Sequence, residues 1–291
     1  MSAIIMDGKA LGLKIREELK TKAAALKQKG ITPCLAVVLV GDNPASLSYV
    51  KSKEKALEEA GMESRDIRLS ESTSEEELLS LIAQLNSDKK VHGILVQSPV
   101  PKHINEEKVI EAISPQKDVD CFHPVSVGKM ILEKPGFLPC TPHGVLLLLR
   151  EYKIPTSGAH VVIVGRSNIV GKPLSNLLIR KEYNATVTLC HTGTKDLISH
   201  TLQADILIAA AGRPDFIKPE MIKEGAVVID VGINRVADSS AQKGYKVCGD
   251  VDPAVACKAS YFTPVPGGVG PMTIAMLLQN VIQAAEEKNV Q

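Results

Sequence analysis

The chain has no tryptophan, few aromatic residues and almost no net charge. Tyr and Phe make up 3% of its 291 residues, which is too few for the aromatic platforms on which nucleic-acid bases stack. A formal charge of +1 gives no overall attraction to nucleic acid or to an anionic membrane. We therefore expect neither nucleic acid nor a membrane as a partner.

Long apolar runs and paired cysteines are also missing. No apolar stretch approaches the roughly 20 residues that span a bilayer, and charges interrupt the N-terminal segment too early for a signal-peptide core. None of the six cysteines forms a C-x-x-C pair, so neither a zinc site nor a redox dithiol is predicted. Cys34 and Cys190 lie in strand-like apolar runs, where reduced thiols act as small hydrophobes. We predict a cytoplasmic protein without a metal site.

Strands and helices alternate along the first half of the chain. Apolar spacing and turn residues predict helices over residues 11–29, 44–60, 75–85 and 106–113, with strands over 34–40, 67–69 and 93–97. The run Cys34–Val40 is apolar throughout, which is typical of a strand buried on both faces. This alternation predicts a parallel sheet covered by helices. Residues 114–142 contain five prolines and are predicted to be irregular.

The second half follows the same plan. A helix is predicted to open at Thr141-Pro142, before strands over residues 160–164, 185–190, 204–212, 225–232 and 261–263. A helix over residues 166–180 follows the first of these strands, and a final helix runs from Pro271 nearly to Gln291. The length of the chain fits two domains.

A strand, a tight turn and a helix meet at Gly165-Arg166-Ser167. The unpaired N–H groups at the start of such a helix attract phosphate. The usual dinucleotide fingerprint is G-x-G-x-x-G, but here Ser167 replaces the second glycine and Gly171 comes one residue late. The pattern favours a dinucleotide site, and a tight turn without a ligand is the alternative.

The residues after the second strand of this half favour NADP over NAD. An acidic residue at that place commonly binds the ribose of NAD, whereas this chain has His191, Thr192 and Thr194 there and Arg166 in the turn. Arg, His and Thr suit a 2′-phosphate, which a carboxylate would repel. The alternative for His191 is an ordinary surface histidine.

Four residues of the first half, Tyr49, Lys53, Gln97 and Asp120, form a candidate catalytic group. Tyr49 and Lys53 are one helical turn apart and share a face, and Gln97 ends a buried strand, where α/β sheets place ligand contacts. A solvated lysine and a polar strand end are the simpler interpretations. Asp118 and Asp120 lack a third residue spaced for a metal, so we expect one to cap a turn and the other to face a cleft.

The segment Thr263–Thr273 is the most unusual of the chain. Three glycines and three prolines in eleven residues impose a fixed, tightly turned backbone. Such a loop lets the main chain approach a ligand closely. A rigid connection between domains is the alternative, and the two interpretations are compatible.

These stretches together resemble the bifunctional methylenetetrahydrofolate dehydrogenase/methenyltetrahydrofolate cyclohydrolase family. The resemblance covers almost the whole chain in order, and its most specific part is Pro264–Thr273. The other matching stretches are residues 41–46, 49–53, 96–99, 117–120, 139–142, 164–167, 170–173, 229–234 and 249–252.

The resemblance implies an α/β fold of two domains. Residues 1–141 would form an N-terminal substrate-binding and catalytic domain, and residues 142–271 a Rossmann-type NADP-binding domain. The C-terminal helix, residues 272–291, would return to the first domain. The implied enzyme oxidises 5,10-methylenetetrahydrofolate with NADP and hydrolyses the product to 10-formyltetrahydrofolate, as a homodimer formed through the cofactor domain.

The resemblance also implies roles for single residues. Lys53 would be the catalytic lysine, tuned by Gln97 and Tyr49; Tyr49 would stack on the folate and Asp120 would accept hydrogen bonds from the pterin. The remaining implied substrate contacts are Val96, Ser98, Pro266, Gly267, Gly268, Val269 and Gly270. The implied cofactor contacts are Gly165, Arg166, Ser167, His191, Thr192, Ile233 and Thr273.

Three residues depart from the family pattern near the implied pterin pocket. Cys121 stands where the family usually has Gly, and Ser98 and Val100 replace leucines. Two other functions remain open at this point. One is a different NADP dehydrogenase on the same plan, acting for example on a shikimate-like acid; the other is a non-catalytic dinucleotide sensor, which would have no need of Lys53.

Overall fold

The computed structural model describes residues 2–241 and 244–287. The chain forms two compact units: unit 1 comprises Met1–Gly12 and Cys140–Thr273, and unit 2 comprises Leu13–Pro139 and Ile274–Gln291. Helices α1 (Gly8–Gln28) and α9 (Val269–Glu287) contribute residues to both. The fold is therefore an α/β fold of two units, as the sequence predicts.

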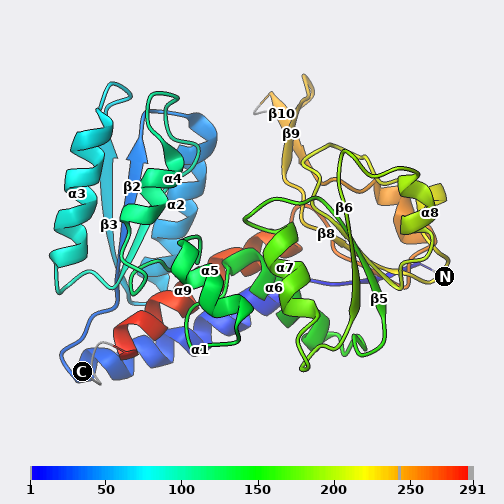
Figure 1. The fold of residues 1–291 in the computed structure, drawn as a ribbon, viewed down its shortest axis with the longest axis horizontal. Coiled ribbons are helices and arrows are strands. Elements are labelled where there is room, and N and C mark those ends of the chain that lie inside the picture. Colours follow the sequence, from blue (N-terminus) through cyan, green and yellow to red (C-terminus); the bar gives the residue numbers. More distant parts are fainter. Residues whose placement is uncertain (1, 242–243, 288–291) are drawn as a thin grey trace. The chain divides into compact units, whose positions relative to one another are not determined.

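Unit 2 is built on a three-stranded parallel sheet in the order β3-β2-β4 (Figure 1). All seven residues of β2 are buried, which confirms the strand predicted from its unbroken apolar run. Cys34 and Val38 on one face of β2 pack with Leu78 and Ile82 of α3 and with Val109 of α4. The elements are β2 (Cys34–Val40), α2 (Pro44–Glu59), β3 (Glu63–Leu69), α3 (Glu75–Ser87), β4 (Gly93–Val96) and α4 (Glu106–Ala112).

The proline-rich stretch 114–142 is more regular than predicted. It contains a helix, α5 (Pro124–Ile131), which Pro124 can begin because its missing N–H is not needed at the first position. The His123 ring nitrogen accepts the N–H of Val125 and caps this helix. The prediction of an irregular segment was therefore wrong for these residues, because prolines that interrupt a helix can also start one.

Helix α9 completes unit 2, as expected for a C-terminal helix that returns to the first half of the chain. The amide of Asn280, 2% exposed, donates to the carbonyl oxygens of Val119 at 2.7 Å and Leu138 at 2.9 Å. The Gln283 amide donates to the Gly136 carbonyl oxygen. The bond to Val119 ties helix α9 to the turn that carries Asp118 and Asp120.

Unit 1 contains a six-stranded parallel sheet in the order β1-β11-β8-β7-β5-β6. Its edge strand β1 (Ile4–Ile5), which the sequence did not predict, pairs with β11 and places the start of the chain in this unit. Val162, Leu207 and Val228, from three neighbouring strands, lie in one core. The other strands are β5 (His160–Val164), β6 (Thr186–Cys190), β7 (Ile206–Ala209), β8 (Val227–Asp230) and β11 (Tyr261–Phe262).

Shorter elements connect these strands. A second sheet is the antiparallel hairpin of β9 and β10, yellow to orange in Figure 1. The remaining elements of unit 1 are α6 (Cys140–Glu151), α7 (Gly171–Leu178), α8 (Leu197–Thr201), β9 (Asn234–Ala237), β10 (Tyr245–Cys248) and two short 3-10 helices, Pro219–Met221 and Pro253–Cys257. Within residues 2–241 and 244–287, no helix combines the length and hydropathy needed to cross a membrane.

His143 makes unit 1 sensitive to acid. Burial in α6, together with the nearby positive charge of Arg150, lowers the pKa of its imidazole to about 4. Its Nδ1 is buried without a hydrogen-bond partner in the described part of the chain. A group whose pKa falls on folding stabilises the fold above its unfolded pKa, near 6.5, and loses that contribution as the pH falls toward 4.

We therefore expect His143→Leu to flatten the acid side of the stability curve. Between pH 7 and pH 4.5, the free energy of unfolding of the unmodified protein should fall by about 2 kcal/mol more than that of the variant. Urea denaturation at both pH values measures this difference. His200→Leu, at a partly exposed position of α8, is the control and should follow the unmodified protein. Equal pH dependence of all three proteins would contradict the role given to His143.

Candidate functional site

A buried lysine lies at the centre of the candidate site in unit 2. Lys53 lies one turn after Tyr49 on α2 and is 5% exposed. Its Nζ donates to Oε1 of Gln97 at 3.1 Å and lies 4.4 Å from the centre of the Tyr49 ring. A buried ammonium group is unfavourable unless dipoles or π-electrons compensate it. The amide oxygen and the ring provide both, so Lys53 is not a solvated surface lysine.

Gln97 is oriented from two sides. It follows the C-terminal end of β4, and its backbone N–H donates to the carbonyl oxygen of Val38 at 2.8 Å. Its side-chain Nε2 donates to the carbonyl oxygen of Ser98 at 2.7 Å, which directs Oε1 toward Lys53. The Ser98 hydroxyl is bonded in turn to the carboxylate of Glu106. The sequence placed Gln97 at a strand end, and the structure brings it to Lys53.

The two carboxylates of the Asp118-Val119-Asp120 turn have different surroundings. Asp118 is 3% exposed, and its oxygens accept the N–H groups of Phe122 at 3.1 Å and His123 at 2.9 Å. Asp120 is half-buried and lines a cavity with Val96, Ser98 and Phe122. The prediction that one carboxylate caps a turn and the other faces a cleft is confirmed.

Cys121 is the residue that stands where the family pattern has Gly, and the structure shows how its side chain is accommodated. Its φ of +61° lies in the left-handed region, where glycine is the usual residue. Its thiol is directed into the protein and donates to the carbonyl oxygen of Phe137 at 3.2 Å. The side chain is 1% exposed and is not among the residues that line the Asp120 cavity.

In unit 1, the turn after β5 opens a cavity of about 390 Å³. Gly165 has a φ of +131°, and a Cβ there would collide with the carbonyl oxygen of Ala210. The Ser167 hydroxyl accepts the N–H of Val170 at 3.1 Å and holds the turn. Gly165, Arg166 and Ser167 all line the cavity.

The predicted histidine and threonines also line this cavity. His191, Thr192 and Thr194 line it after β6. The N–H of Gly193 donates to Nδ1 of His191 at 3.1 Å, so Nε2 is the ring's donor when the imidazole is neutral. Arg166, His191 and the two hydroxyls surround the cavity with donors, and no carboxylate is among the residues that line it.

Several other residues that line this cavity were not predicted, among them an arginine and a phenylalanine. Arg213 and Phe216 line it from the loop after β7, with the guanidinium carbon of Arg213 4.2 Å from the centre of the Phe216 ring. Neither belongs to a motif, and only the strand-end position of the loop could have indicated them.

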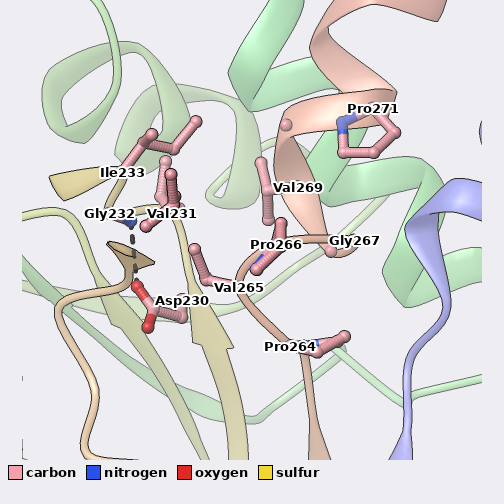
Figure 2. A pocket seen from close by; sticks show the side chains of 13 residues that line it. Asp230, Val231, Gly232, Ile233, Pro264, Val265, Pro266, Gly267, Val269 and Pro271 are labelled. Carbon is pink, nitrogen blue, oxygen red and sulfur yellow. Dashed lines mark hydrogen bonds between the residues drawn. The ribbon is translucent and has the colours of Figure 1, made fainter. Parts of the chain in front are cut away.

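A second cavity of unit 1, about 170 Å³ in volume, lies beside the Gly- and Pro-rich segment. Figure 2 shows Pro264, Val265, Pro266 and Val269 on one side and the loop with Gly232 and Ile233, after β8, on the other. The predicted residues Ile233 and Pro266–Gly270 therefore lie together. Thr273, predicted as a cofactor contact, lines neither cavity; its hydroxyl is bonded to that of Thr141 at 2.9 Å and to the Val269 carbonyl oxygen at 3.4 Å.

Asp230 closes this second cavity at the end of β8. Burial raises the pKa of its carboxyl to about 6, although three backbone N–H groups donate to it. In Figure 2 its carboxylate accepts the N–H of Gly232, at 2.9 Å. Among residues 2–241 and 244–287, no group of three or more His, Cys, Asp or Glu side chains is arranged to hold a metal ion.

Both halves of the chain match one known protein family. Residues 6–120 match the catalytic domain, and residues 139–289 the NAD(P)-binding domain, of the tetrahydrofolate dehydrogenase/cyclohydrolase family. The chain is 58% identical over 288 residues to the bifunctional protein FolD of Halalkalibacterium halodurans, covering 99% of this chain and 100% of the relative.

Two solved structures are similar over nearly their whole length. The bifunctional FolD methylenetetrahydrofolate dehydrogenase/cyclohydrolase of Campylobacter jejuni is 53% identical, with a TM-score of 0.93 over 98% of this chain and 99% of that one. The Trypanosoma brucei enzyme of the same name, solved with NADP cofactor and an inhibitor, is 38% identical, with a TM-score of 0.95 over 100% of this chain and 99% of that one.

Proposed function

Because the chain belongs to the tetrahydrofolate dehydrogenase/cyclohydrolase family, we propose that it is a bifunctional enzyme of one-carbon metabolism. It oxidises 5,10-methylenetetrahydrofolate to the 5,10-methenyl form with NADP and hydrolyses that form to 10-formyltetrahydrofolate. The observation that carries this proposal is the buried Lys53, held by Gln97 and Tyr49 in unit 2. A protein that only sensed a dinucleotide would have no use for this group.

Lys53 acts in proton transfer during hydrolysis. Water adds to the methenyl carbon, the bond between that carbon and N5 of the folate breaks, and one proton is released. The amine at Nζ is held by the Gln97 oxygen and can exchange a proton with the water or with N5. In its charged form it also polarises the folate, because a buried charge acts strongly in surroundings of low polarity.

Tyr49, beside Lys53, and the residues that line the Asp120 cavity bind the folate. Tyr49, half-buried beside Lys53, offers a ring face for stacking on the substrate's aromatic system. Asp120 has acceptor oxygens at its cavity and suits the amino and N–H groups of a pterin. Val96 and Ser98 line the same cavity and limit its shape.

The cavity at Gly165 fits a dinucleotide with a 2′-phosphate. Without a Cβ, the turn brings backbone N–H groups close to the start of α7, where phosphate is favoured. Arg166, His191 and Thr192 supply donors for further phosphate oxygens. When bound, NADP accepts the hydride that the methylene carbon gives up.

The second cavity of unit 1 holds the nicotinamide side of this site. Ile233 and the segment Pro266–Gly270 form its walls and exclude water from the reacting groups. Thr273 supports the segment indirectly, because its hydroxyl is bonded to the carbonyl oxygen of Val269.

We further propose that the enzyme works in the cytoplasm as a homodimer joined through unit 1, as the family resemblance implies. Sedimentation of the purified protein tests the second part. A mass of twice the 31.2 kDa chain is expected, and a monomer at micromolar concentration would contradict it.

One assay tests the proposed function. The purified protein is mixed with NADP and methylenetetrahydrofolate, and cofactor reduction and formyl product are followed together; both should appear. Shikimate replaces the folate in a parallel reaction, where no reduction is expected. Binding of NADP without turnover of the folate would favour a sensor, and turnover of shikimate would favour the other dehydrogenase.

A further inference from the structure

Two buried aspartates connect the two cavities of unit 1. Asp250 is 0% exposed and Asp230 is 1% exposed; Asp230 is the last residue of β8, and Asp250 lies two residues after the end of β10. Backbone N–H groups of the loops that line the two cavities donate hydrogen bonds to these two carboxylates. Within residues 2–241 and 244–287, neither carboxylate forms a salt bridge. Backbone N–H groups donate to both, and the side-chain amide of Asn234 donates to Asp250 as well.

The Asp250 carboxylate organises the loop after β7. Its Oδ2 accepts the N–H groups of Ala211 at 2.6 Å and Gly212 at 2.8 Å. Its Oδ1 accepts the N–H of Arg213 at 2.9 Å and Nδ2 of Asn234 at 2.8 Å. Ala211 and Arg213 line the larger cavity, so this carboxylate sets the position of one of its walls.

The Asp230 carboxylate organises the loops on the other side. It accepts the N–H groups of Gly232, Asp250 and Val251, each at 2.9 Å. Gly232 precedes Ile233 at the second cavity (Figure 2). Gly249 has no side chain where a Cβ would collide with this carboxylate. One continuous set of hydrogen bonds therefore runs from Gly232 through Asp230 and Asp250 to the loop at residues 211–213.

We infer that Asp250, held by Asp230, is a positioning residue for the dinucleotide, an inference that rests on the proposed function. It fixes the loop at residues 211–213 against the adenosine side while Asp230 fixes Gly232 on the nicotinamide side. Each buried charge is unfavourable by itself, and four N–H donors compensate Asp250. A neutral side chain would not accept four such bonds, so the charge serves the geometry of the loop.

Asp250→Asn tests this inference because it keeps the shape and removes one acceptor. An amide –NH₂ in place of either oxygen faces two N–H donors, which it repels, so the loop must move. We expect the Kd for NADP, measured by titration calorimetry, to rise about tenfold. Hydrolysis of added methenyltetrahydrofolate without NADP should stay within about twofold, because its proposed catalytic residues belong to unit 2.

A second substitution should partly restore binding. In Asp250→Asn/Asn234→Asp, the new carboxylate at position 234 can accept the amide of residue 250. The amide oxygen is then directed to Ala211 and Gly212. Part of the lost NADP affinity should return. Asp252→Asn is the matched control, because the Asp252 carboxylate pairs with Lys218, caps a 3-10 helix and lines neither cavity; the NADP affinity of this variant should not change.

Each result of these measurements either supports or overturns the role given to Asp250. An unchanged NADP Kd in Asp250→Asn, or an equal loss of hydrolysis and NADP binding, would overturn the inference. If this variant does not fold, Asn234→Ala decides: a Kd raised about threefold supports the inference and an unchanged Kd overturns it. Failure of the proposed function is recognised separately, because the unmodified protein would then bind NADP without oxidising methylenetetrahydrofolate.

Discussion

Replacing Lys53 with Met should lower the hydrolysis of methenyltetrahydrofolate by about a thousandfold, because a positioned proton-transfer group contributes factors of this order. The methionine side chain keeps much of the length of lysine but can neither hold nor move a proton. Lys53 is 5% exposed and its Nζ is bonded to the Gln97 oxygen at 3.1 Å. A solvent-exposed lysine elsewhere on the protein therefore cannot replace it. The rate at which each protein hydrolyses purified methenyltetrahydrofolate measures this effect.

The binding of NADP should be unaffected by this change, because Lys53 belongs to unit 2 and the Gly165 cavity to unit 1. Lys55→Met is the matched control on the same helix. The Lys55 side chain is 77% exposed and pairs only loosely, at 3.8 Å, with Glu59, so its loss should leave hydrolysis unchanged. If Lys53→Met hydrolyses the substrate at the normal rate, the lysine has no part in the mechanism.

The second large effect is expected on cofactor choice. Arg166→Ala should raise the Kd for NADP about fiftyfold and the Kd for NAD no more than about twofold, because a charge-assisted bond to a phosphate is lost only from NADP. Arg166 lines the cavity together with His191 and Thr192, where the sequence has no carboxylate to bind a ribose hydroxyl. Calorimetric titration with both cofactors gives the two constants.

Arg235→Ala provides a control for the loss of an arginine from the same unit. The guanidinium carbon of Arg235 lies 4.8 Å from the centre of the Tyr245 ring in the hairpin of β9 and β10, and Arg235 does not line the cavity. Its loss should change neither constant. Equal weakening of NADP and NAD in Arg166→Ala would mean that this residue does not distinguish the 2′-phosphate.

Local sequence patterns were sufficient to predict much of the fold. The unbroken apolar run Cys34–Val40 predicts a strand buried on both faces, and all seven residues of β2 are buried. The pair Tyr49 and Lys53 shares a helix face because the helical repeat requires it. Both features depend on residues close together in the chain, which is why the sequence alone indicates them.

The features that were not predicted depend on distant residues. Strand β1 exists only because β11, more than 250 positions later, offers an edge to pair with. The bonds from Asp250 to the loop at residues 211–213 span 37 to 39 positions. No periodicity signals such contacts, and the sequence showed Asp250 only as part of a family motif. Helix α5 was also not predicted, because the prolines of residues 114–142 indicated an irregular segment.

The central claim is that one protein moves a hydride to NADP and then hydrates the same carbon. The most direct measurement supplies methylenetetrahydrofolate with two deuterium atoms on its one-carbon unit and analyses both products by mass spectrometry. We predict one deuterium in the reduced cofactor and one in the formyl group of 10-formyltetrahydrofolate, in equal amounts. Reduced cofactor without deuterium, or a formyl group that retains none, would contradict the proposed reaction.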